Sequence, residues 1–238
     1  MIFDYCTIMV SETEYDFLPL HLKSLKKYNP DDVLNVKMSI RPEDHEKTVA
    51  MLACNNIKDI DLMPEPSYIQ GGEGAKQCAF DTSYRMDKLM QSCSADWVIL
   101  SHLDIIHTAP MIDRVRHLLD DKHSVVGIWP HGCTIINRKV YDYCHFKFWP
   151  LNAAQAVVHH GNVGVTIYTH IKQEREPLVC VEGIDVGMMI IIESRTYGYL
   201  VDIGSPARCY YHVGGLSLNE DESNRRRKIA LEKFRDLK

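Results

Sequence analysis

The chain has the length and composition of a folded domain with a sizeable core. It contains 238 residues, of which 45% are hydrophobic, 9% aromatic and 25% charged. These shares exclude a disordered chain, and the length suits one large domain. The 27 basic residues against 32 acidic ones give a formal net charge of −5. Without a general positive field, a protein that coats nucleic acid through its phosphates is not expected.

Neither a membrane span nor a disulfide framework is expected. No apolar run reaches the roughly 18–20 residues that a span needs. The stretch 1–16 has no basic segment and carries Asp4 early, which does not match a signal peptide. The eight cysteines are scattered without a CxxC pair, mostly among apolar neighbours. We therefore expect a cytoplasmic protein with reduced, buried thiols.

Strands and helices alternate through the first hundred residues. The apolar stretch 5–10 is rich in strand formers, and 33–40 is predicted as a second strand. Between them, leucines recur at helical spacing from Leu18, and the helix stops before Asn29, which a proline follows. A short helix over 44–53 comes next.

A glycine-rich loop over 71–74 precedes another helical pattern. Apolar residues recur at helical spacing from Ala75 to Cys93, and a strand over 97–100 follows. This alternation predicts an α/β fold with a mostly parallel central sheet and helices on both faces. Ligands of such sheets bind outside the carboxyl ends of the strands, so the residues after Leu100 are the first candidates for chemistry.

The second half of the sequence is less regular. It closes on a helix that begins acidic and turns basic, as suits the helix dipole. The alternative for its basic cluster, from Arg225 to Lys228, is a nucleic-acid patch. The predicted elements are a helix over 109–120, a strand over 124–129, a loop rich in Trp, His and Pro over 129–162, a helix over 183–197, a strand over 199–203 and the closing helix over 219–238.

The strand over 97–100 runs into two candidate metal ligands. His102 and Asp104 are separated by one residue, so an extended chain places both side chains on the same side. An imidazole and a carboxylate together suit Mn²⁺ or Mg²⁺ holding a diphosphate. The alternative is that Asp104 caps the following turn beside a structural histidine.

Two later segments supply further candidates. His212 ends an apolar strand and runs into Gly214, where the backbone can come close to a phosphate or a metal. Glu182 and Asp185 lie three residues apart at the start of a predicted helix, where a carboxylate can act as a general base. Each has a structural alternative, since a lone histidine is often part of the core and carboxylates often cap helices.

Together these segments resemble the GT-A glycosyltransferases, especially those of the family 2 type. The stretch from Asp96 to Asp104 is similar to the family's strand that ends in Asp-x-Asp, with His102 in place of the first Asp. The resemblance extends in order over about 5–218. The other similar segments are the loop and helix after Gly74, the stretch Gly132-Cys-Thr-Ile-Ile-Asn on the acceptor side, the acidic catalytic segment Glu182-Gly-Ile-Asp185 and the late segment His212-Val-Gly-Gly-Leu-Ser.

The resemblance implies a GT-A (Rossmann-like) fold in a single domain over 1–238. Residues 1–104 would be the nucleotide-sugar-binding half, 105–218 the acceptor and catalytic half, and 219–238 a C-terminal helix. The implied activity is a metal-dependent, inverting transfer of a sugar from a UDP- or GDP-sugar to a hydroxyl. The acceptor stays open between a glycan, a small molecule and a modified DNA base.

The resemblance also implies roles for single residues. Asp104, His102 and His212 would hold Mn²⁺, or Mg²⁺, on the diphosphate. Asp185, or else Glu182, would take the proton from the acceptor hydroxyl. The residues expected to bind the nucleotide sugar are Asp104, His102, Ser11, Asp81 and Gly214, and Asp44 is a further candidate after the second strand.

Three other functions compete with this one. His102, Asp104 and His107 could form the metal-binding run of a hydrolase. His131, His159, His160 or His212 would complete that site. A nucleotidyltransferase would also use a metal-held diphosphate, although its basic glycine-rich opening loop is not seen. A catalytically inactive nucleotide-sugar-binding module is the third, because His102 replaces an expected Asp.

Overall fold

The computed structural model describes most of the first half of the chain and shorter pieces of the second half. The described residues are 1–9, 12–66, 85–86, 88–119, 125–128, 133–138, 147–150, 165–168, 200–202, 209–213 and 220–237.

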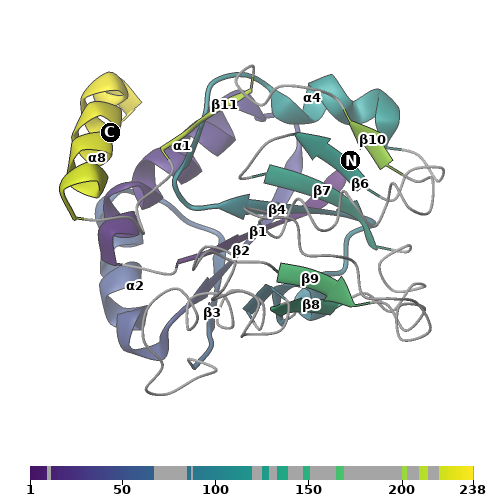
Figure 1. Cartoon of the computed structure of the whole chain (residues 1–238), viewed down its shortest axis with the longest axis horizontal. Coiled ribbons are helices and arrows are strands. Elements are labelled where there is room, and N and C mark those ends of the chain that lie inside the picture. Colours follow the sequence, from purple (N-terminus) through teal and green to yellow (C-terminus); the bar gives the residue numbers. More distant parts are fainter. Residues whose placement is uncertain are drawn as a thin grey trace.

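A seven-stranded sheet, in the order β10-β6-β7-β4-β1-β2-β3, forms the centre of the molecule (Figure 1). Its strands are β1 (Ile2–Ile8), β2 (Val33–Ile40), β3 (Ile60–Pro64), β4 (Trp97–His102), β6 (Val125–Ile128), β7 (Cys133–Asn137) and β10 (Leu200–Asp202). Two small sheets pair β5 (Ile105–His107) with β11 (Tyr210–His212), and β8 (Lys147–Pro150) with β9 (Val165–Tyr168).

The large sheet is mixed but mostly parallel. β1 runs parallel to β2 and β4, β2 parallel to β3, and β10 parallel to β6. Among the described strands of this large sheet, only β7 runs antiparallel to its neighbours, which are β4 and β6. The predicted α/β fold with a mostly parallel central sheet is therefore confirmed.

Helical segments lie on both faces of this sheet. α1 (Leu18–Tyr28), α2 (His45–Cys54) and α4 (Met111–Val115) pack on one face, and α8 (Glu220–Lys233) lies outside α1. The 3-10 turns are η1 (Glu12–Asp16), η2 (Pro42–Asp44), η3 (Arg116–Leu118) and η6 (Arg235–Leu237). Residues 85–86 and 88–92 are also helical. No described helix is long and apolar enough to cross a bilayer.

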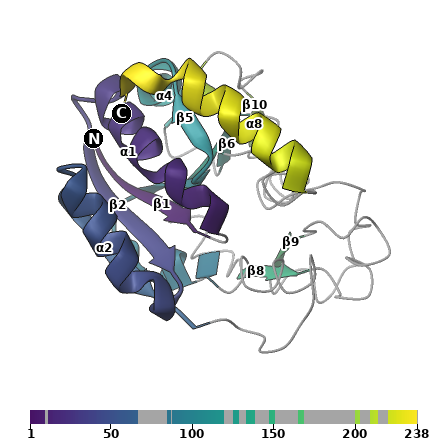
Figure 2. The same ribbon diagram turned by 90° about the vertical axis from the view of Figure 1, so that its left-hand side faces the viewer.

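The alternation of β1 side chains decides which helices lie on which face. Phe3 and Tyr5 pack in one cluster with Leu25 of α1, and α1 and α2 lie over this face of β1 and β2 (Figure 2). Cys6 points the other way, where its Sγ lies 3.4 Å from the Sγ of Cys93, just after the helical residues 88–92. Both faces are thus buried, as is typical of parallel strands.

The sequence predicts several of these elements closely. The strand expected over 33–40 is β2, and the helix that begins with Leu18 ends at Tyr28, where Asn29 bonds back to the Leu25 carbonyl. The other confirmed elements are α2 for 44–53, β4 for 97–100, α4 and η3 for 109–120, β6 for 124–129, β10 for 199–203 and α8 for 219–238. The part of the helix predicted from Ala75 that lies before 85, and the helix over 183–197, fall outside the described residues.

The loop predicted over 129–162 is wrong where the structure describes it. Residues 133–137 form β7 and 147–150 form β8. β7 forms because it pairs with two strands, β4 and β6, and Ile135 and Ile136 are buried there. This short apolar run was assigned to the loop because the residues on either side of it include Trp, His and Pro.

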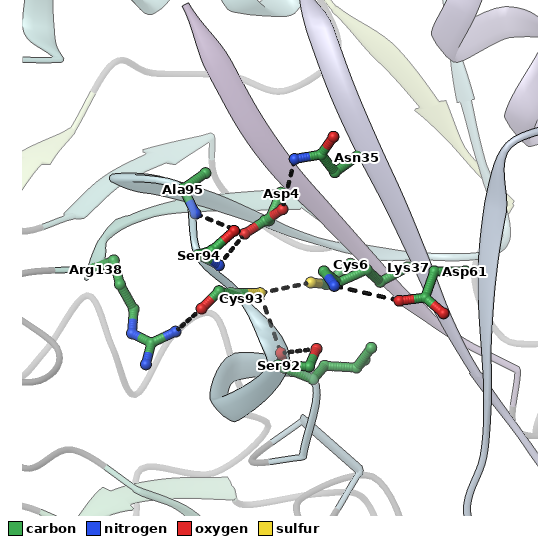
Figure 3. A network of polar contacts seen from close by, with 11 residues as sticks. Asp4, Cys6, Asn35, Lys37, Asp61, Ser92, Cys93, Ser94, Ala95 and Arg138 are labelled. Atoms are coloured by element: carbon green, nitrogen blue, oxygen red, sulfur yellow. Dashed lines mark hydrogen bonds and ion pairs between the residues drawn. The ribbon is translucent and has the colours of Figure 1, made fainter.

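The first strand begins earlier than predicted. β1 starts at Ile2 rather than at residue 5, because Asp4 interrupts the apolar pattern but is fully buried. Its carboxylate accepts hydrogen bonds from the backbone N–H groups of Ser94 (2.5 Å) and Ala95 (2.8 Å) and from the Asn35 amide (3.1 Å), as Figure 3 shows. β3, β5 and β9 are strands that the sequence did not predict.

The C-terminal helix packs on the outside of α1. Ala230 of α8 is buried against Phe17, Leu20 and Ile106, and Arg227 forms an ion pair with Asp16 of η1. Within the basic cluster from Arg225 to Lys228, Arg227 therefore has a structural role, because it links α8 to η1.

Candidate functional site

The candidate site lies at the edge of the sheet where the parallel strands end. β1, β2, β3 and β4 are parallel neighbours, so their carboxyl ends meet along one edge. Ile8 is in register with His102 across β1 and β4. In open α/β sheets this edge is where ligands bind.

His102 and Asp104 occupy the tight turn that follows β4. β4 ends at His102 and β5 begins at Ile105, so only Leu103 and Asp104 lie between the two strands. Asp104 is buried, and His102 is half-buried. Both side chains lie close enough to His21 to act on its charge. The sequence predicts an extended chain here, but residues 103–104 form a turn, so the two side chains do not share a face by strand alternation.

The structure brings the late segment of the chain to the same turn. β11 pairs with β5 in antiparallel register, with His212 opposite Ile105. The next residue, Val213, donates its backbone N–H to the Asp104 carbonyl at 3.1 Å. Residues about a hundred positions apart in the sequence thus meet at the turn, although the described part of the chain includes only the backbone of His212.

The donor set at this turn fits a divalent cation. A carboxylate oxygen and an imidazole nitrogen suit Mn²⁺, which accepts both. Among the described side chains, no group of three His, Cys, Asp or Glu residues that could hold a metal is found. A site at this turn would take its third ligand from a residue whose side chain is not described, such as His212.

A chain of buried polar groups lies directly beneath the turn. The Tyr5 hydroxyl is 3.1 Å from Nε2 of His21 and 3.0 Å from Nε2 of His107. Nδ1 of His21 lies 2.7 Å from the carbonyl oxygen of Ile105. Burial lowers the pKa of His21 to about 4, opposed by the bond to Ile105 and by Asp104. Burial and His21 lower the pKa of His107 to about 3, so both imidazoles are neutral at pH 7.

These contacts are at odds with the hydrolase alternative. His107 is fully buried, and its Nε2 is bound to Tyr5 rather than directed at Asp104. It therefore belongs to the core beneath the turn, and the run of His102, Asp104 and His107 does not gather around one point.

Asp44 makes structural contacts at the carboxyl end of β2. It is buried, and its carboxylate accepts a hydrogen bond from Nε of Arg41 at 2.6 Å. Its backbone carbonyl accepts bonds from Tyr15 and Thr48. A surface pocket nevertheless lies at the carboxyl ends of β2 and β3, lined by Pro42, Glu43, His45, Glu46 and Pro64.

Arg85 is a buried cation at this edge that the sequence did not single out. Its guanidinium donates to the carbonyl of Met9, just past the end of β1, at 2.6 Å. The sequence pattern that could have pointed to Arg85 is an arginine among apolar helical residues, such as Met86 and Met90, which are buried. The hydrogen bond from Arg85 to Met9 ties this helix to the end of β1.

The remaining predicted site residues fall outside the described part of the chain. They are Ser11, Asp81, Glu182, Asp185 and Gly214, and the same holds for His131, His159 and His160. Of the described cysteines, Cys6, Cys93, Cys133 and Cys209 are buried, whereas Cys54 is exposed, contrary to the expectation of buried thiols.

Comparisons with known proteins show similarity in structure only. No protein-family model matches the chain, and no curated protein sequence matches it. TarS 1–349 of S. aureus has a TM-score of 0.49 at 10% identity, over 89% of this chain and 60% of that one. The glycosyltransferase GlyE of Streptococcus pneumoniae TIGR4 has a TM-score of 0.46 at 11% identity, over 85% and 44%.

The mannosyltransferase PcManGT from Pyrobaculum calidifontis, in complex with GDP-Man and Mn²⁺, has a TM-score of 0.45 at 11% identity. It is matched over 68% of this chain and 53% of that one. The chain is similar in structure to these three proteins, and it spans only 44–60% of their length. Remote similarity of this kind concerns the fold and says nothing of activity.

Proposed function

We propose that the chain is a metal-dependent glycosyltransferase that moves a sugar from a UDP- or GDP-sugar to a hydroxyl acceptor. One observation carries the proposal: the turn with His102 and Asp104 ends the central strand β4, and β11 brings His212 and Val213 to the backbone of that turn. This arrangement supports a metal-held diphosphate at the carboxyl edge of the sheet, where ligands of open α/β sheets bind.

The proposed roles follow from the chemistry of each group. Asp104, with His102 and His212, would hold Mn²⁺, and the bound ion would supply positive charge to neutralise the departing diphosphate. Asp185 accepts the proton of the acceptor hydroxyl. As the proton leaves, the hydroxyl oxygen bonds to the anomeric carbon, and the bond between that carbon and the diphosphate breaks. Attack opposite the leaving group inverts the configuration at that carbon.

The first prediction concerns Asp104. The wild type should show a higher melting temperature with UDP or GDP plus Mn²⁺ than with either component alone, because bound ligand stabilises the folded state. Asp104→Asn keeps the shape of the side chain but removes its charge, so the joint stabilisation should disappear. The melting temperatures of the wild type and of Asp104→Asn are measured with Mn²⁺, with the nucleotide and with the two together.

Asp236→Asn is the matched control for this prediction, since Asp236 is an exposed carboxylate in η6. It should respond to Mn²⁺ and nucleotide like the wild type. If Asp104→Asn also responds like the wild type, the metal is bound elsewhere and the assignment is wrong.

The second prediction separates donor binding from transfer. Asp185→Asn should bind the nucleotide as the wild type does, while transfer falls by about 10²–10⁴-fold because the general base is lost. A donor screen with mass detection of the released nucleoside diphosphate, and then of the glycosylated acceptor, measures the rate. If Asp185→Asn transfers sugar at the wild-type rate and Glu182→Gln does not, Glu182 is the general base instead of Asp185.

A further inference from the structure

One turn of α1 holds the backbone of β5 through two buried side chains. His21 contacts the Ile105 carbonyl through Nδ1 at 2.7 Å, and the hydroxyl of Ser24 accepts the backbone N–H of His107 at 2.9 Å. Ser24 also donates to the His21 carbonyl at 2.9 Å, which fixes its hydroxyl. On this side, side chains replace the hydrogen bonds that a neighbouring strand would make.

The direction of each hydrogen bond follows from its partners. A carbonyl oxygen only accepts, so Nδ1 of His21 carries the proton and donates it to Ile105. In neutral His21, Nε2 is then an acceptor and receives the Tyr5 hydroxyl proton. The Tyr5 oxygen in turn accepts from Nε2 of His107. His21 is therefore held in one tautomer and one orientation by groups in the core.

Two successive carbonyls of the turn are fixed from opposite sides. The Asp104 carbonyl accepts from Val213 next to β11, and the Ile105 carbonyl accepts from His21 of α1. Fixing both carbonyls restricts the backbone dihedral angles between them. Because the direction of the Asp104 side chain follows from that backbone, the two contacts set where its carboxylate lies.

We propose that His21 is a positioning residue for the metal-binding turn, acting on Asp104 through the Ile105 carbonyl. This inference rests on the proposed function, since it assigns Asp104 to Mn²⁺. Residues that orient metal ligands without touching the metal contribute to affinity because the ligand is held in place before the ion arrives. His21 lies 83 positions before Asp104 in the sequence, and its role depends on how α1 packs on β5.

The test uses two substitutions that each keep one nitrogen of the imidazole. The amide nitrogen in His21→Asn lies where Nδ1 was and can still donate to Ile105. The amide nitrogen in His21→Gln lies where Nε2 was, near Tyr5, and cannot reach Ile105 in the same way. Tyr5→Phe is the control, because it removes the hydroxyl that contacts both histidines and leaves the bond to Ile105 intact.

Mn²⁺ affinity is measured by electron paramagnetic resonance of the free ion, in the presence of whichever of UDP and GDP the wild type binds. His21→Gln should weaken the affinity by about 10–100-fold, the range for ligand-orienting residues. His21→Asn should restore most of it. Tyr5→Phe should lower the melting temperature while leaving the affinity near that of the wild type.

Each other result overturns the inference in an identifiable way. If His21→Gln binds Mn²⁺ like the wild type, His21 serves only stability, although the proposed function stands. If the wild type itself shows no nucleotide-dependent Mn²⁺ binding, the proposed function fails and the role of His21 with it. Should His21→Gln not fold, Ser24→Ala is the second variant. It removes the hydrogen bond from the His107 backbone N–H to the Ser24 hydroxyl, through which α1 also holds the backbone of β5. It should weaken Mn²⁺ binding by about tenfold, and wild-type affinity in that variant would also overturn the inference.

Discussion

At the scale of single residues, the most informative feature is the set of polar groups buried beneath the turn after β4. His21 and His107 are fully buried, and both contact the Tyr5 hydroxyl. Nδ1 of His107 has no hydrogen-bond partner among the described residues. Protonating either ring would place a charge in an apolar core, which explains why burial lowers both pKa values.

These pKa values predict that the protein loses stability in mild acid. The pKa of His21 is about 4 in the folded protein against 6.5 for an ordinary histidine, and that of His107 is about 3. Below pH 6.5 the unfolded chain therefore binds protons that the folded one does not. Stability is fully present above pH 6.5 and falls toward the folded pKa, by about 1.4 kcal/mol per pH unit for each such histidine. Urea unfolding between pH 7 and pH 4.5 measures it.

The matched variant for this measurement is His21→Asn, which removes one of the two titrating rings. Its stability should fall less steeply with acid, by about 1.4 kcal/mol per pH unit below the wild-type slope. The groups that face His21 are Tyr5, His107, Asp104 and His102. Equal slopes for the two proteins would show that His21 does not resist protonation.

At the scale of elements, β1 fixes where β4 begins. Asp4 accepts the backbone N–H groups of Ser94 and Ala95, and Arg138 donates to the carbonyls of Met90 and Cys93 at the end of the preceding helical segment. Figure 3 shows the contacts of Asp4 with Ser94 and Ala95 and the contact of Arg138 with Cys93. The entry to β4 is thus fixed from β1 and from the end of β7, at the edge opposite the candidate site.

Asp4→Ala should consequently destabilise the protein strongly. It leaves two backbone N–H groups without an acceptor, and a buried donor that loses its partner costs about 1–3 kcal/mol. The exposed carboxylate of Asp61, which pairs with Lys37 on β2, provides the control. Asp61→Ala should change the free energy of unfolding by about 0–1 kcal/mol, as is usual for exposed ion pairs. Similar losses in the two variants, measured by urea unfolding, would contradict this account.

At the scale of the whole molecule, one sheet joins the two halves that the resemblance distinguishes. β7 and β6 lie beyond residue 105 but continue the sheet from β4, and β10 extends it further. β11 returns to β5 at the turn after β4. The candidate site therefore draws on both halves of the chain.

The sequence alone determined the features that local patterns encode. Apolar runs gave β2 and β4, leucine spacing and the Asn29-Pro30 stop gave α1, and strand–helix alternation gave the parallel sheet. His102 and Asp104 could be singled out because they end an apolar strand, and the carboxyl ends of parallel strands meet at one edge.

The tertiary structure decided what depends on contacts between distant residues. Asp4 interrupts an apolar run, yet it lies in β1 because Ser94 and Ala95 satisfy its carboxylate. His107 resembles a metal ligand in the sequence and is a core residue because Tyr5 lies opposite it. The contact of His21 with Ile105 has no local sequence pattern, since only the packing of α1 on β5 creates it.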